Sequence, residues 1–298
     1  MSIGIVLLSL PALALALDGP PPSPSGYVRP ELLIEPAELK RRLDQPTEGK
    51  LVLLDVRKRA DFERDHVPGA CWVDHTAWAG SALEPRTVPL AVVEGAPVDL
   101  FAPGVTLVVY DDAKANHAAR IWWILRFWGC QDVRLLNGGW RGWQASQGPT
   151  RAGTPSTVHT LTVPSRRAKK HLAERTDVLA ALGREQIVDS RSEAEHCGED
   201  ERAQRSGSIP GAKHLDWNDL LDPQTHRFRT AAELRALFRG AQIALDQPII
   251  AHCQSGGRSS VMAFALELMG ADHVRNYYAS WAEWGNRDDT PIVKPKKK

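Results

Sequence analysis

Short apolar runs and amphipathic segments alternate along most of the chain. Four runs are almost continuously apolar: 50–56, 105–110, 186–189 and 248–251. Runs of this kind are typical of strands that are buried on both faces of a parallel sheet. The pattern therefore predicts central strands whose two faces are both covered.

Segments with a helical period lie between these runs. Apolar residues recur every three or four positions at 36–43 and 231–238, which predicts amphipathic helices. Two further apolar segments, 121–128 and 261–269, are each followed by a glycine, as helices often are. This alternation predicts an α/β fold, a mainly parallel central sheet flanked by helices on both faces. In such folds, ligands bind beyond the carboxyl ends of the strands.

The chain contains this pattern twice. When the predicted strand at 107–110 is aligned with the one at 248–251, the same alignment without a gap matches Trp140 with Trp281 and Trp143 with Trp284. Upstream, an Asp-x-Arg motif and a Pro-Gly-Ala motif also occur in both copies. They lie farther apart in the second copy, which carries an insertion of eight residues between them. Such repetition predicts two homologous domains.

Shifts in composition mark the ends of the two copies. Glycine and proline cluster between them, and proline and serine follow an apolar run near the N-terminus, as in extended linkers. The predicted organisation is a leader with a Pro/Ser linker at 1–26, a first domain at 27–147, a linker at 148–166, a second domain at 167–291 and a basic tail at 292–298.

The apolar run at 3–17 has the length of a targeting segment. It is shorter than the roughly 20 residues that a membrane-spanning helix needs. Ala14 and Ala16 fit the small-x-small cleavage pattern of a secretory signal peptide. We therefore expect an exported, periplasmic protein with no membrane span in its mature form. No Lys or Arg precedes the run, so an uncleaved extension on a cytoplasmic protein stays the alternative.

Composition and charge argue against several classes of protein. Of the 298 residues, 43% are hydrophobic and 24% charged, as in an ordinary globular protein. A net charge of +1 does not indicate a nucleic-acid-binding surface. Four cysteines without a Cys-x-x-Cys pair support neither a disulfide scaffold nor a structural zinc site. We expect no metal and no cofactor, and the sequence leaves the oligomeric state open.

One cysteine lies in a loop that is suited to chemistry. Cys253 follows a buried strand and opens a short loop with two glycines, after which a helix begins. Backbone N–H groups of such a loop and the helix dipole favour an anion at one point and lower the pKa of a thiol. Cys253 is therefore the candidate nucleophile, and Arg258 adds a positive charge beside it. The candidate anion cradle consists of Gln254, Ser255, Gly256, Gly257 and Ser259.

The first copy lacks this chemistry. In the ungapped alignment Asp112 takes the place of Cys253, and the glycines are missing, which predicts an inactive first domain. His252 precedes the cysteine on the strand and should point away from it, so a buried structural histidine is favoured over a general base. The remaining cysteines lack such a loop and are expected to be bystanders: Cys71, Cys130 and Cys197.

These motifs resemble those of the two-domain rhodanese (thiosulfate sulfurtransferase) family. The resemblance covers about 33–293, and its motifs include Asp-x-Arg after a strand and (Val/Ile)-Pro-Gly-Ala in both copies. Two tryptophan motifs also match, Asn-Gly-Gly-Trp-Arg-x-Trp at 137–143 and Tyr-x-Ser-Trp-x-Glu-Trp at 278–284. The resemblance implies two tandem rhodanese-like domains, of which the second is catalytic.

The resemblance also implies a reaction in two steps. The Cys253 thiolate takes the outer sulfur of thiosulfate and releases sulfite, and the persulfide then passes its sulfur to cyanide or a thiol acceptor. By its match to the family, Arg191 is expected to bind the substrate together with Arg258, and Trp217 to line the mouth of the pocket. An ion pair between Arg191 and Asp189 stays the alternative, because the inactive copy has an arginine at the same place. For Trp217 the alternative is simple packing.

Three other functions also use a cysteine in such a loop, and they differ from thiosulfate sulfurtransferase in the loop sequence or in whether the protein turns over. The loop of 3-mercaptopyruvate sulfurtransferases is typically Cys-Gly-Ser-Gly-x-Thr, and here Gln254 and Arg258 depart from it, which favours the dianion thiosulfate. A persulfide carrier that serves a partner protein would also need Cys253. A phosphatase loop of the Cys-x5-Arg type has one residue more between cysteine and arginine than this loop, so phosphate chemistry is disfavoured.

Overall fold

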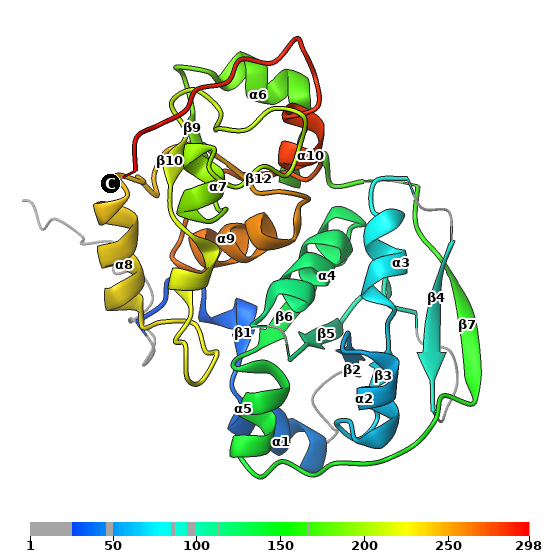
Figure 1. The fold of residues 1–298 in the computed structure, drawn as a ribbon. Coiled ribbons are helices and arrows are strands. Elements are labelled where there is room, and N and C mark those ends of the chain that lie inside the picture. Colours follow the sequence, from blue (N-terminus) through cyan, green and yellow to red (C-terminus); the bar gives the residue numbers. More distant parts are fainter. Residues whose placement is uncertain are drawn as a thin grey trace, which may run out of the picture.

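The chain folds into two α/β domains, each built around its own sheet (Figure 1). The computed structural model describes residues 26–45, 50–84, 87–93, 99–112, 114–165 and 167–297. The expected signal peptide lies outside these residues. Within them, no helix combines the length and the apolar character that crossing a membrane requires.

The first domain contains a sheet of seven strands in the order β1-β6-β5-β2-β3-β4-β7. Its strands are β1 (Leu33–Ile34), β2 (Lys50–Asp55), β3 (Cys71–Trp72), β4 (Thr87–Val92), β5 (Val105–Tyr110), β6 (Asp132–Leu136) and β7 (Thr157–Thr162). Its helices are η1 (Pro30–Leu32), α1 (Pro36–Asp44), α2 (Arg59–Arg64), α3 (His75–Gly80), α4 (Asn116–Phe127) and α5 (Gly139–Ala145). All neighbouring strands are parallel except the pairs β3–β4 and β4–β7.

The second domain contains a parallel sheet of five strands in the order β10-β9-β11-β12-β8. Its strands are β8 (Leu172–Ala173), β9 (Gln186–Asp189), β10 (Lys213–His214), β11 (Ile249–His252) and β12 (Val274–Tyr277). Its helices are η2 (Lys169–His171), α6 (Arg175–Ala181), α7 (Glu193–Cys197), η3 (Trp217–Leu220), α8 (Ala231–Gly240), α9 (Gly257–Leu268) and α10 (Ser280–Trp284). The four strands and four helices that the apolar pattern predicts are all present.

Alternate residues of the central strands enter different hydrophobic clusters. In β2, Val52 and Leu54 join the cluster on the α4 side, whereas Leu53 joins the cluster that holds Phe62 of α2 and Trp143 of α5. This is the geometry of a strand that is buried on both faces. The prediction of a mainly parallel sheet with helices on both faces is therefore correct.

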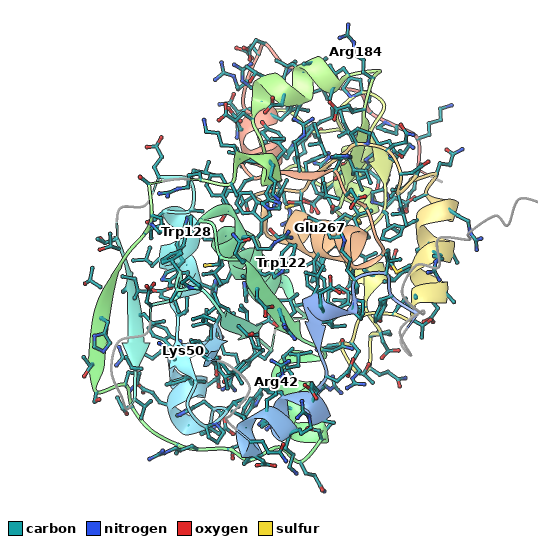
Figure 2. All side chains as sticks on the ribbon, turned by 180° about the vertical axis from the view of Figure 1, so that it is seen from behind. Arg42, Lys50, Trp122, Trp128, Arg184 and Glu267 are labelled. Atoms are coloured by element: carbon teal, nitrogen blue, oxygen red, sulfur yellow. The ribbon has the colours of Figure 1, made fainter. Side chains whose placement is uncertain are left out.

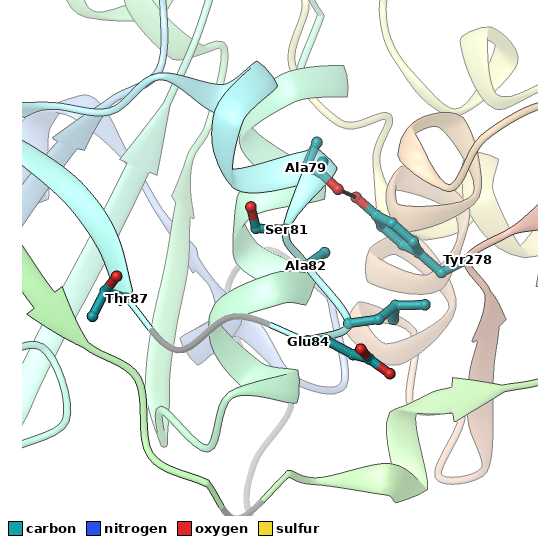
Figure 3. Close-up of a pocket in the computed structure, with 8 residues that line it drawn as sticks. Ala79, Ser81, Ala82, Glu84, Thr87 and Tyr278 are labelled. Atoms are coloured by element: carbon teal, nitrogen blue, oxygen red, sulfur yellow. Dashed lines mark hydrogen bonds between the residues drawn. The ribbon is translucent and has the colours of Figure 1, made fainter.

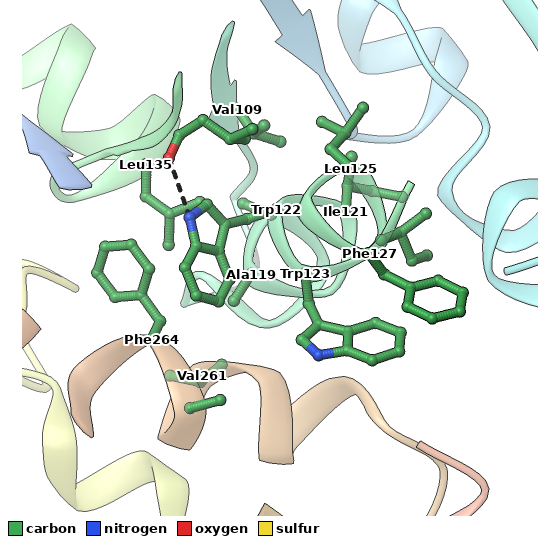
Figure 4. Packing of buried hydrophobic residues seen from close by; sticks show 14 of the residues in the cluster. Val109, Ala119, Ile121, Trp122, Trp123, Leu125, Phe127, Leu135, Val261 and Phe264 are labelled. Atoms are coloured by element: carbon green, nitrogen blue, oxygen red, sulfur yellow. Dashed lines mark hydrogen bonds between the residues drawn. The ribbon is translucent and has the colours of Figure 1, made fainter. Parts of the chain in front are cut away.

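The two domains share a continuous core where α4 packs against α9. The Trp122 and Phe264 rings meet edge to face with centroids 5.0 Å apart, and Val261 packs beside them (Figure 4). At the rim of this contact the Arg126 guanidinium pairs with the Glu267 carboxylate and lies 4.7 Å over the Trp122 ring. Figure 2 shows Trp122 and Glu267 at this junction from the opposite side. Burial of such large apolar surfaces holds the two domains in one arrangement.

Two segments outside the expected domains also belong to the fold. Strand β7 lies within the predicted linker at 148–166, yet it pairs with β4 and closes the edge of the first sheet. In the predicted basic tail, Val293 exchanges two backbone hydrogen bonds of 2.8 and 3.0 Å with Ser208. Neither segment shows a strong apolar run, because each pairs at an edge of its domain and not within a buried sheet.

Candidate active site

Cys253 stands where β11, an inner strand of the second sheet, meets the N-terminus of α9. The residue is 1% exposed. Helix α10 holds the loop from the other side. The Trp281 backbone N–H donates to the Cys253 carbonyl at 3.0 Å, and the Ala282 backbone N–H donates to the Gln254 carbonyl at 2.9 Å. The thiol is thus fixed at the carboxyl edge of the sheet, where ligands bind in folds of this type.

The surroundings of the thiol favour its anionic form. Burial alone would raise the pKa of the Cys253 thiol. The positive charge of Arg258, the Ser259 hydroxyl at 3.4 Å and backbone N–H groups of Ser259 and Ser255 outweigh burial, and the net effect lowers this pKa. A side-chain base is not among these groups, so the loop and the helix terminus themselves stabilise the thiolate.

The five residues of the predicted cradle divide into two roles. Ser255 and Ser259 direct N–H groups at the sulfur, whereas the Gln254 side chain turns away and donates to the Arg202 carbonyl at 3.0 Å. Gly256 is required by geometry: its φ is +85°, and a Cβ there would lie 2.6 Å from the Tyr278 ring. Gly257 begins α9.

A buried polar layer supports the loop from below. The Cys253 N–H donates to the Ser280 hydroxyl at 3.1 Å, and this oxygen lies 3.9 Å from the sulfur. The Ser259 hydroxyl donates to the Asn276 side-chain oxygen at 2.8 Å, and the Asn276 amide donates to the Gly256 carbonyl at 3.3 Å. Because these polar groups are satisfied within the protein, they can hold the loop in one conformation.

Ser280 adopts a backbone conformation that non-glycine residues rarely take. Its φ is +56°, and its counterpart in the first copy is Gly139 with a φ of +54°. A left-handed conformation costs a residue with a side chain about 1–3 kcal/mol, and such costs concentrate at functional sites. The second copy therefore tolerates strain to place a hydroxyl beneath Cys253.

Arg258 is held by a carboxylate of α7. Its guanidinium donates to both oxygens of Glu195 at 2.5 and 2.8 Å, and the Glu195 side chain is 2% exposed. Burial would raise the pKa of Glu195, but Arg258 and Ser192 lower it to about 2. Arg258 therefore acts on the thiol through its charge, while the nitrogens expected to bind substrate are engaged with Glu195.

Arg191 does not fit the substrate-binding role that the resemblance implies. Its guanidinium donates to Asp189 at 2.9 and 2.6 Å and to the Gly207 carbonyl at 2.8 Å. It also stacks 4.2 Å from the Trp281 ring, and its side chain is only 1% exposed. The alternative, an ion pair with Asp189, is the one that the structure shows.

The first copy repeats this arrangement around its own arginine. Arg57 pairs with Asp55 at 2.7 Å and lies 3.9 Å from the Trp140 ring, and both charged side chains are fully buried. A motif that both copies build in the same way is a structural element of the fold. The buried pair with Asp189 therefore engages the Arg191 guanidinium, which the resemblance had implied for substrate.

Trp217 begins η3 and is half-buried against the shared core. Its backbone N–H donates to the Ser190 carbonyl at 3.3 Å, which fixes the start of the turn after β10. Its side chain packs against the shared hydrophobic core, and its place at the mouth of the pocket stays a prediction.

The register of the strands shows that the residue equivalent to Cys253 in the first copy is not the expected one. His252 pairs with Asp189, whereas Tyr110 pairs with Asp55, so the residue that leaves the strand in the first copy is Asp111. The expectation of Asp112 was wrong by one position, because the loop before α4 has one residue more than the loop before α9. Asp112 itself is exposed.

Asp111 fills the site that the thiol occupies in the second copy. Its carboxylate accepts hydrogen bonds from the N–H groups of Ala115, His117 and Ala118 at 2.8–3.0 Å and is 1% exposed. The set of N–H donors thus persists in the first copy and is occupied by a carboxyl group of the protein itself, whose pKa burial raises against these hydrogen bonds. That copy has no thiol at this position.

His252 and the other cysteines take no part in the cradle. Burial lowers the pKa of His252 to about 4, so the ring is neutral at pH 7 and lies 3.8 Å from Asp189. Burial raises the pKa of Cys71 to about 11 and that of Cys130 to about 12. Cys197 ends α7 and is buried. Within the described part of the chain, no cluster of three metal-ligating side chains is found.

Several residues of the site escaped the sequence analysis. Ser280 could have been noticed, since it replaces a glycine within a tryptophan motif that both copies share. Glu195 and Asn276 carry no such signal, because their roles depend on contacts across elements. The same holds for Arg120 of the first domain, which donates to the Ser255 hydroxyl at 3.3 Å.

Comparison with known proteins finds relatives along nearly the whole chain. The Rhodanese-like domain model matches it twice, at residues 35–146 and 174–287. A thiosulfate sulfurtransferase of Azotobacter vinelandii is 32% identical over 272 residues, which covers 88% of this chain and 96% of that protein. One of Corynebacterium glutamicum is 34% identical over 290 residues, covering 92% and 94%. The sulfur carrier protein TtuD of Thermus thermophilus is 33% identical over 288 residues, covering 90% and 99%.

Solved structures with the same fold are more distant. YnjE aligns with a TM-score of 0.72 at 22% identity, over 89% of this chain and 69% of that chain. An anaerobic ergothioneine biosynthesis enzyme of Chlorobium limicola aligns with a TM-score of 0.71 at 20% identity, over 89% and 71%. At these identities the likeness concerns the fold alone.

Proposed function

The chain belongs to the rhodanese family and is a sulfurtransferase of the rhodanese type, and we propose that Cys253 carries the transferred sulfur as a persulfide. The observation that carries this proposal is the buried thiol at the N-terminus of α9, whose pKa the cradle and Arg258 lower against the effect of burial. A thiolate held in this way is a sulfur nucleophile that needs no neighbouring base.

Thiosulfate is the proposed donor. The Cys253 thiolate attacks the outer sulfur atom, a sulfur–sulfur bond forms to the enzyme, and the bond within thiosulfate breaks so that its electron pair leaves with sulfite. The persulfide anion then stands in the cradle of N–H groups. A thiophilic acceptor such as cyanide takes the terminal sulfur, and the thiolate is restored. Neither step consumes an oxidant or a proton, which suits a dry site with fixed N–H donors.

Turnover with thiosulfate and cyanide tests this function. We expect thiocyanate to form with the wild-type protein and to fall to background with Cys253→Ser, because a hydroxyl of ordinary pKa cannot take up sulfane sulfur. Cys197→Ala is the matched control, since it removes a thiol outside the cradle. Full turnover by Cys253→Ser would refute the assignment of the nucleophile.

Two other functions of the same cysteine make different predictions. A 3-mercaptopyruvate sulfurtransferase would show higher kcat/KM with that donor than with thiosulfate in the same preparation. A sulfur carrier, the function named for the relative in Thermus thermophilus, would gain the mass of one sulfur atom at Cys253 but show no steady-state turnover with cyanide. We favour thiosulfate because relatives that cover most of the chain are named for it.

We propose in addition that the protein is exported. The support is the apolar run at 3–17 with its small-x-small pattern, and these residues lie outside those that the structure describes. Sequencing the N-terminus of the protein purified from its own cells tests the idea. An intact Met1 would overturn it.

A further inference from the structure

A pocket of about 440 Å³ lies between the first domain and the cysteine loop. Helices α3 and α4 form one wall, and the loop with the segment after β12 forms the other. Its polar lining residues are His75, Thr76, His117, Arg120, Ser255 and Tyr278. The Tyr278 hydroxyl reaches across and donates to the Ala79 carbonyl at 3.3 Å, which marks the boundary with a neighbouring pocket (Figure 3).

Arg120 is the charged side chain of this pocket. Its Nη2 donates to the Ser255 hydroxyl at 3.3 Å, while its buried Nε has no partner among the described residues. No carboxylate in the described part of the chain pairs with it, in contrast to Arg57, Arg191 and Arg258. A half-buried guanidinium without a counterion is costly unless a ligand supplies the negative charge.

The guanidinium also lies against the cysteine loop. A Cβ added to Gly257 would lie 2.8 Å from Arg120 Nε, so the helix that stabilises the thiolate begins beside this cation. Ser255 connects the two groups directly, because its N–H bonds the sulfur and its hydroxyl accepts from Arg120. Tyr278 lies near both groups, because it lines the same pocket as Arg120 and its ring lies 2.6 Å from the position that a Cβ on Gly256 would take.

The other titratable groups of the pocket do not compete with Arg120 for an anion. The His75 and His117 rings stack with centroids 3.8 Å apart. Burial, with the charge of Arg120, lowers the pKa of both rings, so they are neutral at pH 7. Neutral imidazoles offer hydrogen bonds without full charge, and Arg120, which contacts Ser255 of the cysteine loop, is the fixed cation among the residues that line the pocket.

We propose that Arg120, contributed by the inactive domain, binds the sulfonate end of the sulfur donor and the sulfite that leaves. This rests on the proposed function. A planar guanidinium matches the oxygens of an oxyanion in a bidentate manner, and negative charge grows on sulfite as the sulfur–sulfur bond breaks. Arg258 cannot serve in the same way while Glu195 engages it. The first domain would then complete a site whose nucleophile belongs to the second.

Steady-state kinetics with thiosulfate test the proposal. Arg120→Gln should lower kcat/KM for thiosulfate about 10- to 100-fold, weaken inhibition by added sulfite and leave the KM for cyanide unchanged. Arg120→Lys should restore part of the loss. Lys114→Ala is the control, because it removes a positive charge from the same domain. The Lys114 amine donates to Asn218 and does not line the pocket. An unchanged kcat/KM in Arg120→Gln, with wild-type turnover intact, overturns the proposal.

Alkylation of Cys253 gives a readout that is independent of turnover. The ratio of the alkylation rate with anionic iodoacetate to the rate with neutral iodoacetamide should be higher in the wild-type protein than in Arg120→Gln. The ratio of the two rates cancels any change in the thiol pKa, and the melting temperature checks that the variant is folded. If thiosulfate does not turn over but the ratio still depends on Arg120, the proposed function fails and the anion site stands. If the ratio is unchanged, the anion site fails.

Discussion

Replacing Glu195 by Gln would show how much the buried ion pair beside the cysteine loop contributes to stability. Glu195 accepts from Arg258 at 2.5 and 2.8 Å and from the Ser192 N–H at 3.1 Å, and it is 2% exposed. Glutamine has nearly the same shape, so the substitution removes a charge without opening a cavity. Arg258 would then be a largely buried cation without its counterion, and we expect the second domain to be destabilised.

Two separate arguments give a similar size for the loss of unfolding free energy in Glu195→Gln. The pKa of Glu195 falls from 4.5 to about 2, and at about 1.36 kcal/mol per pKa unit this corresponds to roughly 3 kcal/mol. The Arg258 side chain is 17% exposed, so solvent screening reduces the figure to about 2–3 kcal/mol. Breaking a buried pair by removing one partner costs about 3–5 kcal/mol, and a partly exposed arginine belongs at or below the lower end.

Urea unfolding between pH 7 and pH 3 measures this contribution. A carboxylate whose pKa is depressed in the folded state stabilises the protein above pH 4.5, and this stabilisation is lost as the pH falls toward about 2. Because Gln does not titrate, the difference in unfolding free energy between wild type and variant should be largest at pH 7 and shrink below pH 4.5. Glu199→Gln, at a carboxylate that is 53% exposed, should differ from wild type by less than about 0.5 kcal/mol.

The Glu195→Gln substitution should also lower the pKa of the Cys253 thiol. Without Glu195 the full charge of Arg258 acts on Cys253, so the thiol pKa should fall further although the domain is less stable. A loss below about 1 kcal/mol at pH 7, or a difference that stays constant down to pH 3, would refute the reasoning. So would a thiol pKa that rises in the folded variant.

Three further changes test other parts of the site. Arg191→Lys should lower the unfolding free energy by about 2–4 kcal/mol while the KM for thiosulfate stays within about twofold, and a large rise in KM at unchanged stability would restore its substrate role. Ser280→Gly should relieve backbone strain but remove an acceptor from the Cys253 N–H, so kcat/KM should fall about tenfold with the melting temperature nearly constant, and unchanged kinetics would show that the hydroxyl is dispensable. Because the pKa of Cys253 is lowered, the midpoint of its alkylation rate against pH should lie below about 8.5, the value for a free thiol. Ser259→Ala should move this midpoint upward, and a wild-type midpoint at or above about 8.5 would contradict a cradle that stabilises the thiolate.

The sequence determined the architecture because the signals for it are local. Strand β11 and helix α9 follow from an apolar run, a Gly-Gly turn and a helical period within about 20 consecutive residues. The same local pattern, a cysteine between a buried strand and a helix N-terminus, was sufficient to single out Cys253. The internal repeat made the second domain predictable from the first.

Register and charge pairing were decided only by the tertiary structure. A loop one residue longer placed Asp111, not Asp112, in the cradle of the first copy, and only strand pairing fixes that position. Arg191 and Arg258 both follow motifs that suit an anion, yet one pairs with Asp189 and the other with Glu195. Arg120 has no feature in the sequence that distinguishes it from other arginines. Its place beside the cysteine loop comes from the contact of α4 with α9. Electrostatic partners are set by distances of a few ångströms between elements that lie far apart along the chain.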